Sequence, residues 1–392
     1  MATAPLAIYE TTSAEELYET APEQELALRE EGIHFLTAGQ ASCEKFAAEW
    51  QALVARTGEP NPFFEPWFLL PSLARLDSKG RVEIAAYYLG GELTALAPLT
   101  LSSNYYGYPL PHWEVWLHPN AFCGSPLIAR GYERHFWRTL TGQLGHEQDG
   151  ALFLHLPQIA VDSPGYRALQ AEISSHDRPF ATVGSVERAM LRSDLSAEEY
   201  FEDAMPNKKR KELRRQAKRL GEEGPVTFEQ HSDDTDVAAW SAEFLTLEEA
   251  GWKGDEGSSL ASDAATATLF EEALVGAAAS GKLERLTMRI DGRPIAMLAN
   301  FITPPGAFSF KTAFDENYAR FSPGVLLQKE NLALLDRSDI EWCDSCAAEG
   351  HPMIERIWRQ KRTIASCNVA LGGPLRQAIA KQLFRRETRE RS

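Results

Sequence analysis

The sequence predicts an α/β fold made of two similar domains, each a mixed, mostly antiparallel sheet flanked by helices. With 392 residues, the chain is long enough for two or three domains of average size. Two runs of alternating apolar residues, 82–99 and 283–301, each turn at a pair that favours positive φ, namely Gly90-Gly91 and Asp291-Gly292. The turn glycines are 201 residues apart, about half the chain. We therefore expect an N-terminal domain over 1–190 and a C-terminal domain over 191–392.

The C-terminal half shows the order of elements most clearly. An antiparallel meander followed by a strand–helix–strand crossover makes a mixed sheet with helices on both faces. We expect, in order, a strand at 183–192, a helix from Ser196, a basic helix to Glu222, a strand at 226–231, helices at 234–250 and 263–280, the hairpin 283–301, a strand at 307–314, a helix to Leu335, a strand at 340–345, a helix at 352–361 and a strand at 363–370. The first half follows the same order, with a helix at 40–56, the hairpin, a helix at 131–145 and a strand at 151–156.

Composition excludes several classes of protein. Hydrophobic residues make up 44% and charged residues 24% of the chain, which is typical of a soluble globular protein. Apolar stretches such as 273–279 are far shorter than the roughly 20 residues of a membrane helix. No basic residue precedes Arg29, so we expect no targeting segment, and five cysteines do not make a disulfide framework. These features predict a cytoplasmic protein.

Charge is distributed unevenly along the chain. The net charge of −16 argues against binding to nucleic acid. Residues 208–219 nevertheless hold eight basic residues and one acid. This segment is either a solvated helix face or a surface that attracts an anionic ligand or lipid headgroups, which would give the protein a peripheral contact with the inner membrane.

The segment Arg-Phe-Ser-Pro-Gly-Val-Leu at 320–326 is the strongest local signal, because it follows the third strand of the meander and opens a helix. Free N–H groups at a helix start attract anions, and glycine permits close backbone approach. The alternative is ordinary helix capping, for which Ser-Pro-Gly is a common pattern. We expect this helix start to bind a pyrophosphate through Arg320, Phe321, Ser322, Gly324 and Val325.

Several segments together resemble one group of the GNAT superfamily, the cellulose-biosynthesis-associated, acetyltransferase-like proteins, which are related to Fem-type aminoacyl transferases. The resemblance covers most of 45–365. It implies two tandem GNAT-like domains, with acyl-CoA or another acyl donor, such as charged tRNA, bound by the second. The first copy has no equivalent of this Ser-Pro-Gly directly after its hairpin, so we expect it to bind no donor. The matching segments are Asn61–Trp67, Arg214–Leu220, Leu247–Gly254, Phe310–Tyr318 and Phe321–Leu327.

One segment departs from this group. Relatives commonly carry a Tyr-Lys pair in the helix after the crossover strand, whereas this chain has Glu-Gly-His-Pro-Met-Ile at 349–354. The Asp-Ser-Cys-Ala and His-Pro-Met runs resemble the bacterial GNAT-type ceramide synthases, which N-acylate a sphingoid base. The resemblance therefore implies a long-chain amino lipid as acceptor. An amino sugar or cell-envelope polysaccharide precursor is the alternative, and a non-catalytic binding protein on the same fold is a third interpretation.

Amide formation needs a group that removes a proton from the amine, whose pKa is ~10 for a lysine-like amine. His351, just after the 340–345 strand, is the first candidate, with helix capping as its alternative role. Asp344 is a candidate for the base itself or for a residue that orients His351. Its alternative role is to accept a structural hydrogen bond. Lys311 and Asp315 bracket the end of the third meander strand and either position substrate or pair with each other. Backbone N–H groups over 311–314 are candidates for stabilising the oxyanion.

Other side chains are candidates for contact with the substrates. Trp252 and Lys253 lie in the loop between two helices, and Tyr318 follows the third meander strand. A lipid acceptor needs an apolar channel. Aromatic residues of the first half are candidates to line it, and the alternative is that they belong to the hydrophobic core. These residues are Phe63, Phe64, Trp67, Phe68, Tyr105, Tyr106, Trp113 and Trp116.

We expect no metal site. Cys343, Cys346, His351 and Cys367 have a superficial likeness to a zinc set, but two of the cysteines fall in or beside a predicted strand and the last is distant in sequence. Buried thiols are the favoured interpretation. The sequence also lacks P-loop, GxGxxG, HExxH and GxSxG motifs, and nothing places a serine or cysteine nucleophile on a strand-to-helix elbow.

Overall fold

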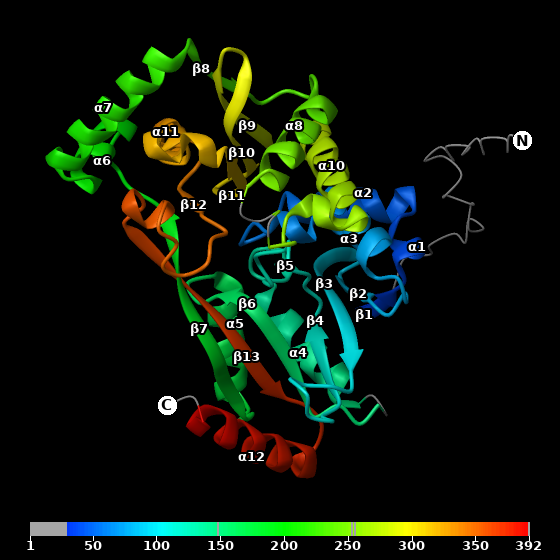
Figure 1. Cartoon of the computed structure of the whole chain (residues 1–392). Coiled ribbons are helices and arrows are strands. Elements are labelled where there is room, and N and C mark those ends of the chain that lie inside the picture. Colours follow the sequence, from blue (N-terminus) through cyan, green and yellow to red (C-terminus); the bar gives the residue numbers. More distant parts are fainter. Residues whose placement is uncertain (1–29, 147–148, 252–253, 255, 391–392) are drawn as a thin grey trace, which may run out of the picture.

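One large mixed sheet runs through the structure, a computed structural model that describes residues 30–146, 149–251, 254 and 256–390 (Figure 1). The elements of the first half are β1 (Gly32–Leu36), α1 (Ala38–Ala41), α2 (Glu44–Val54), the 3₁₀ turn η2 (Pro62–Phe64), α3 (Pro66–Leu76), β2 (Glu83–Leu89), β3 (Glu92–Ser102), β4 (His112–Val115), β5 (Leu127–Ile128), α4 (Glu133–His146), β6 (Phe153–Ala160), α5 (Pro164–Ser175) and β7 (Phe180–Leu191). Those of the second half are α6 (Ala197–Ala204), α7 (Asn207–Glu223), β8 (Val226–His231), α8 (Val237–Glu249), η3 (Leu260–Ser262), α10 (Ala264–Ala279), β9 (Leu283–Ile290), β10 (Arg293–Thr303), β11 (Gly306–Phe314), η4 (Glu316–Phe321), α11 (Pro323–Glu330), η5 (Asn331–Asp336), β12 (Trp342–Asp344), η6 (Ile354–Arg356), β13 (Gln360–Ala370) and α12 (Pro374–Glu390).

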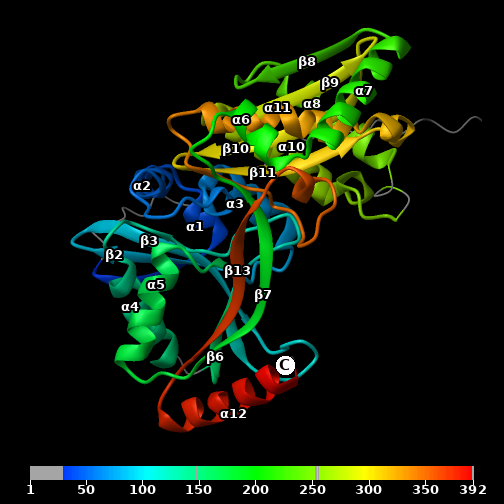
Figure 2. The ribbon, with the colours of Figure 1, turned by 90° about the vertical axis from the view of Figure 1, so that its left-hand side faces the viewer.

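The two halves repeat one order of elements and exchange their last strands. The strands lie side by side in the order β1-β2-β3-β4-β6-β13-β7-β12-β11-β10-β9-β8, and β5 pairs with β3. Each half is mixed and mostly antiparallel, as predicted, with β4–β6 and β11–β12 as the parallel pairs in the described chain. β13 lies between β6 and β7, and β7 pairs with β12 (Figure 2). This exchange, which the sequence did not predict, joins both halves into one sheet. The boundary at residue 190 falls near the end of β7 and stays a prediction.

Both predicted hairpins are confirmed. β2 and β3 pair up to Leu89↔Glu92, and β9 and β10 up to Ile290↔Arg293. All four turn residues have positive φ, between 49° and 80°. Glycine at three of these positions avoids the Cβ clash of left-handed backbone, and aspartate, at the fourth, tolerates it, so the two-residue turns follow directly from the sequence.

Helices cover both faces of the second half of the sheet. Alternate residues of a strand point to opposite faces, and along β10 Met297 and Phe301 join one apolar cluster whereas Leu298 and Ile302 join another. The first cluster includes residues of α8 and α10, and the second includes residues of α6, α7 and α11. A strand buried on both faces reads as a nearly continuous apolar run, as β10 does.

The halves also meet through helices α3 and α10. Gly276 of α10 packs against Trp67 of α3, where a Cβ would lie only 2.9 Å from the Trp67 Cβ. Nearby, Lys282 Nζ donates to Glu65 Oε2 at 2.5 Å. These close contacts fix the position of one half against the other.

The predicted helix over 352–361 is wrong. Only the short turn η6 forms, and β13 begins at Gln360, which pairs with Met190. The Arg359 side chain donates to the Ala204 carbonyl at 2.8 Å, which holds this stretch against α6. The predicted helix to Leu335 is helical as α11 and then continues as the 3₁₀ turn η5.

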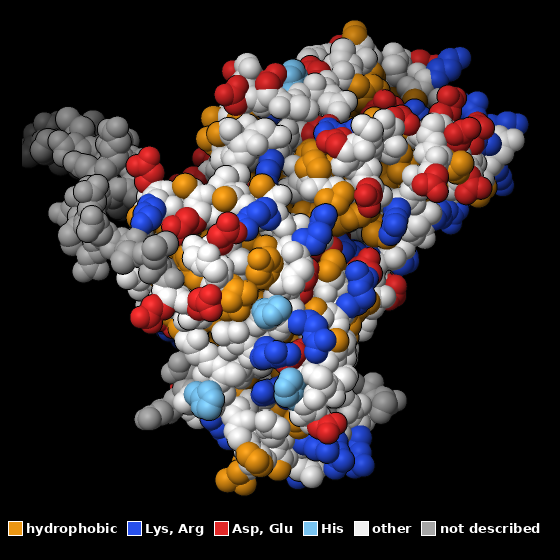
Figure 3. All heavy atoms as spheres, turned by 180° about the vertical axis from the view of Figure 1, so that it is seen from behind, with side chains coloured by type: hydrophobic (Ala, Val, Ile, Leu, Met, Phe, Trp, Pro, Cys, Tyr) orange, Lys and Arg blue, Asp and Glu red, His pale blue; other side chains and the backbone are white. Residues whose placement is uncertain are grey.

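The predicted basic helix is confirmed as α7, with Leu213 and Leu220 buried and most of its lysines and arginines exposed. No helix in the described part of the chain is both long and apolar enough to cross a membrane. Charged side chains of both signs are spread over the upper part of the surface in Figure 3, whereas Lys and Arg gather near its lower end.

Candidate functional site

The sheet opens between β11 and β12. The two strands pair in parallel only from Gly306↔Trp342 to Phe308↔Asp344, where β12 ends, while β11 continues to Phe314. At the same point the pairing of β11 with β10 shifts, so that Phe310 is the extra residue of a β-bulge. Bulges bend a strand, and they are common beside active sites. The opening leaves the β12 side of β11 without a strand partner beyond Phe308 in the described chain.

Lys311 lies at this opening and contacts the first half. It follows the bulge directly, and its Nζ donates to Asn120 Oδ1 at 2.8 Å. The ammonium group also lies 5.1 Å and 5.5 Å from the ring centroids of Phe122 and Phe310, a cation–π arrangement. Because Asn120 and Phe122 belong to the segment after β4, both halves build the surroundings of Lys311.

His118 is a further member of this site that the sequence analysis missed. It is buried and stacks on Phe68 with an interplanar angle of 12°. Its Nδ1 accepts from the Asn120 N–H at 3.3 Å, and its Nε2 lies 3.1 Å from Ser72 Oγ, whose hydroxyl already donates to the Phe68 carbonyl. The proton therefore sits on Nε2. Burial lowers the pKa of His118 to about 4, and the positive charge of Lys311 contributes a smaller part of this shift. The ring is therefore neutral at pH 7.

Asp344 closes the narrow end of the opening. Its carboxylate lies 3.4 Å from Arg188 Nη1 and accepts from the Cys346 N–H at 2.8 Å. Arg188 also donates to the Phe122 carbonyl at 2.7 Å and to Gln158 Oε1 at 3.0 Å. Burial alone would lower the pKa of Arg188, but Asp344 raises it above its ordinary value, so the guanidinium stays charged. The ion pair joins the exchanged strand β7 to β12.

A second buried arginine lies on the neighbouring strand β13. The Arg362 guanidinium donates to Glu59 and, at 2.8 Å, to Asp162 Oδ1, and it lies 4.4 Å from the Trp342 ring. Burial raises the pKa of Glu59, although Arg362 opposes the shift. The centre of the sheet is therefore held by buried ion pairs between the two halves.

Asp315 is engaged by three donors. Arg293 Nη2 donates to its carboxylate at 2.6 Å, and the Asn317 N–H and side-chain amide donate at 2.9 Å and 2.8 Å. Asp315 thus caps η4 and pairs with Arg293. Tyr318 is half-buried on η4, with its ring 6.4 Å from that of Phe321.

The start of α11 differs from an ordinary capped helix. Ser322 has left-handed backbone, with φ 56° and ψ 51°, and its side chain makes no cap hydrogen bond. The chain contains a second Ser-Pro-Gly at the start of α5, where Ser163 is extended and caps the helix. Gly324 and Val325 are buried, and a Cβ on Gly324 would lie 2.4 Å from Met353 Sδ. The segment after β12 therefore packs directly on this helix start.

Arg320 and the basic helix α7 meet at η4. The Arg320 guanidinium is exposed, pairs with Glu223 at 2.9 Å and lies 4.6 Å from the ring of the buried Phe321. Gln216 of α7 donates to the Arg320 carbonyl at 3.1 Å. Positive charge therefore lies close to the start of α11.

His351 is half-buried in the segment between β12 and β13. Its Nδ1 lies 3.5 Å from the Ile354 N–H, at the start of η6, and its carbonyl accepts from the Glu355 N–H at 3.1 Å. His351 therefore lies at the start of the helical turn η6 and accepts hydrogen bonds from its first N–H groups. Trp252 and Lys253 lie outside the described residues.

Cys343, Cys346 and Cys367, the cysteines whose spacing has some likeness to a zinc site, are buried free thiols. Burial raises the pKa of Cys343 and Cys346 well above the usual range. Cys346 also has left-handed backbone, with φ 52°. Within the described residues, no group of three or more His, Cys, Asp or Glu side chains is placed to hold a metal ion.

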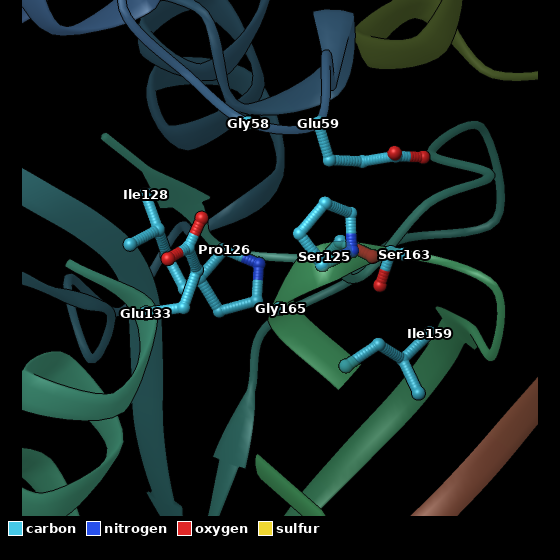
Figure 4. Close-up of a pocket in the computed structure, with 10 residues that line it drawn as sticks. Gly58, Glu59, Ser125, Pro126, Ile128, Glu133, Ile159, Ser163 and Gly165 are labelled. Carbon is cyan, nitrogen blue, oxygen red and sulfur yellow. The ribbon is translucent and has the colours of Figure 1, made fainter. Parts of the chain in front are cut away.

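Two cavities lie near the sheet of the first half. A small one of about 10 Å³ lies beside Glu59 and Ser163 (Figure 4) and has room for about one water molecule. A hollow of about 460 Å³ lies at the corresponding opening of the first half, between β4 and β6, where His112, His118 and His155 line it.

Comparisons with known proteins agree with this geometry. Residues 207–351 match the model of the acetyltransferase (GNAT) domain family, a segment that contains β11, α11, β12 and His351. No curated protein matches the chain. Among solved structures, FemX superimposes with a TM-score of 0.54 at 12% identity, covering 85% of this chain and 98% of that one. A conserved protein of unknown function from Bacteroides thetaiotaomicron has a TM-score of 0.53 at 10% identity, covering 83% and 97%.

The C-terminal domain of a putative lysylphosphatidylglycerol synthetase from Agrobacterium fabrum has a TM-score of 0.50 at 14% identity, covering 85% of this chain and 93% of that one. At these identities the similarity concerns the fold alone, and it extends over both halves of the chain. The segment that matches the acetyltransferase (GNAT) domain model, residues 207–351, lies within the second half of this two-part α/β fold.

Proposed function

We propose that this protein is an N-acyltransferase that moves an acyl group from acyl-CoA to the nitrogen of an amine. The observation that carries the proposal is the opening between β11 and β12, which lies in the GNAT domain and has a β-bulge and Lys311 at its edge. In the reaction, the amine nitrogen attacks the thioester carbonyl and loses a proton. An amide bond forms, the C–S bond breaks, and CoA leaves as the free thiol.

The start of α11 is the proposed site for the pyrophosphate of the donor. Backbone N–H groups and the helix dipole favour an anion there, and Arg320 and the nearby α7 add positive charge. Met353 must move away from Gly324 for a phosphate to approach, and the three rotatable bonds of methionine permit this movement. Charged tRNA is the competing donor, and the net charge of −16 disfavours it.

Lys311 is proposed to position the thioester and to stabilise the oxyanion that forms on its carbonyl. Backbone N–H groups of β11 beyond Phe308 support the same charge, because that edge has no strand partner in the described chain. We propose His351 as the base that takes the amine proton. Asp344 and Asp315, which are already ion-paired, are proposed to hold Arg188 and η4 in place and so to act by positioning.

A long-chain amine is the proposed acceptor, with a sphingoid base as the first candidate. The rings of Phe122 and Phe310 surround Lys311, and burial of each methylene next to such rings contributes ~0.8 kcal/mol. The aromatic residues predicted to line a channel are divided. Phe63, Phe64, Phe68 and Tyr105 belong to buried clusters, whereas Tyr106 is exposed and lines open hollows.

The test is CoA release, measured as free thiol, from long-chain acyl-CoA with sphinganine or with an amino sugar. We expect turnover with sphinganine, and we expect Lys311→Met to lower kcat/KM about 100-fold because one oxyanion partner is lost. Lys329→Met, which removes a lysine from the surface of α11, is the matched control and should leave turnover unchanged. Turnover with amino sugars alone would favour a cell-envelope precursor as acceptor, and no turnover with any amine would favour a non-catalytic binding protein.

A further inference from the structure

The end of the molecule farthest from β8 and β9 is built by α12 and the segment 103–110 (Figures 1 and 2). α12 packs on this end through Ala380 and Phe384, which are buried against Tyr105, Phe153 and their neighbours. Its opposite face is exposed in the described structure. Neither the acyl-transfer site nor the GNAT segment includes this end of the molecule.

Large apolar side chains are exposed on this surface. Leu375 and Ile379 of α12 are 77% and 44% exposed, and Tyr106 and Tyr108 are 69% and 65% exposed. Positions four apart share one face of a helix, so Leu375, Ile379 and Leu383 form a single stripe. Leu383 lines a hollow of about 430 Å³ together with Tyr106 and Tyr108. Leu383 therefore lies beside the tyrosines, and Ile379 and Leu375 continue the apolar stripe from there toward the start of α12.

Positive charge accompanies these apolar residues. Lys381, Arg385, Arg386 and Arg389 of α12 are all exposed. They stand out because the chain as a whole carries a net charge of −16. Figure 3 shows hydrophobic side chains beside Lys and Arg at this lower end of the molecule. The leucine and isoleucine lie in the N-terminal half of the helix, and the cations lie in its C-terminal half.

We propose that α12 and the tyrosines of 103–110 bind the surface of an anionic lipid bilayer. A helix that lies in the plane of a membrane surface combines apolar side chains that enter the acyl boundary with cations that meet the phosphates. Tyrosine suits the same interface because its ring is apolar and its hydroxyl is polar. The surface is a docking site independent of the proposed acyl transfer, and it would keep the enzyme close to lipid substrates.

The other basic helix does not fit this role as well. Both leucines of α7 are buried, and its exposed residues are charged or polar, so α7 has no large apolar side chain to insert. Its position beside Arg320 suits the phosphates of a donor instead. The structure therefore assigns membrane contact to α12, whereas the sequence suggested the segment 208–219.

Vesicle sedimentation tests this assignment with the full chain. We expect binding to vesicles of phosphatidylcholine and phosphatidylglycerol, and much weaker binding to phosphatidylcholine alone or at high salt. Arg385→Gln with Arg386→Gln should weaken binding about 30-fold, since two surface cations are lost. Leu375→Ser with Ile379→Ser should weaken it by at least about tenfold through lost insertion. The matched control, Lys208→Gln with Lys209→Gln on α7, should have little effect.

Several outcomes would overturn the proposal. Equal binding to neutral vesicles, no binding to either kind, or loss of binding only in the α7 variant would each contradict it. A dimer of the wild type that the Leu375→Ser/Ile379→Ser variant abolishes would identify a second copy of the chain as the occupant. Circular dichroism of each variant shows that it folds. Calorimetry with acyl-CoA on the α12 variants separates this proposal from acyl transfer, because their donor affinity should stay unchanged.

Discussion

Replacement of Asp344 by asparagine tests whether this carboxylate holds the sheet together or takes part in the chemistry. The substitution keeps the shape of the side chain and its hydrogen bond from the Cys346 N–H but removes the negative charge beside Arg188. Arg188 is then a buried cation whose remaining acceptors are uncharged, the Phe122 carbonyl and Gln158. Both strands of the pair, β7 and β12, lie at the junction between the halves.

The expected cost follows from the burial of both partners, whose side chains are only 6% and 3% exposed. Removing one member of a buried ion pair costs about 3–5 kcal/mol, because the other charge is left without compensation. The two carbonyl acceptors that remain place the expected value near the lower limit, about 3 kcal/mol. Asp339→Asn, in the exposed pair with Arg337, is the control and should cost at most about 1 kcal/mol.

Urea unfolding of both variants measures the difference, and CoA release measures activity of the folded fraction. We expect Asp344→Asn to unfold at lower urea concentration while its turnover per folded molecule falls less than tenfold. Arg188→Met combined with Asp344→Leu should recover much of the stability, since neither charge of this pair remains buried. An Asp344→Asn variant with unchanged stability and abolished turnover would refute this reasoning and make Asp344 a catalytic residue.

Two further predictions concern protonation and donor binding. His118 has a pKa of about 4 in the folded protein and ~6.5 when unfolded, so the unfolded chain binds more protons between these values and stability falls as pH decreases from ~6.5 to ~4. The stability lost over this pH range is on the order of 3 kcal/mol. In acid titrations followed by circular dichroism, the His118→Asn variant should therefore lose less stability than the wild type between pH ~6.5 and ~4. Equal losses would contradict the lowered pKa of His118. Gly324→Ala should displace Met353 and weaken acyl-CoA binding at least about tenfold in calorimetry, because the bare Cα permits phosphate approach. The control Gly221→Ala, which meets nothing within 4 Å, should leave affinity unchanged, and equal affinity in both variants would argue against the α11 site.

Local chemistry explains what the sequence predicted of the fold. The turn pairs at Gly91 and Gly292 specify left-handed backbone, so the two hairpins and their repeat were visible without a structure. The Ser-Pro-Gly at 322–324 marked a helix start correctly, although its left-handed Ser322 could not be distinguished from the capping Ser163 by sequence.

Long-range pairing explains what could not be predicted. The exchange of β7 and β13 depends on partners more than 150 residues apart, such as Gln360 and Met190, and no local signal reports it. The partnership of Lys311 with Asn120 and His118 arises only when the halves meet. The helix expected over 352–361 does not form for a related reason. The pairing of β13 with β7, which begins at Gln360, prevails over the local helix preference.

Isothermal titration calorimetry with long-chain acyl-CoA tests the central claim most directly, since the proposed function requires a CoA thioester bound within the GNAT domain. We predict saturable binding of one acyl-CoA per chain, weakened in the Gly324→Ala variant. Absence of heat with every CoA thioester, together with transfer that depends on charged tRNA, would contradict the account.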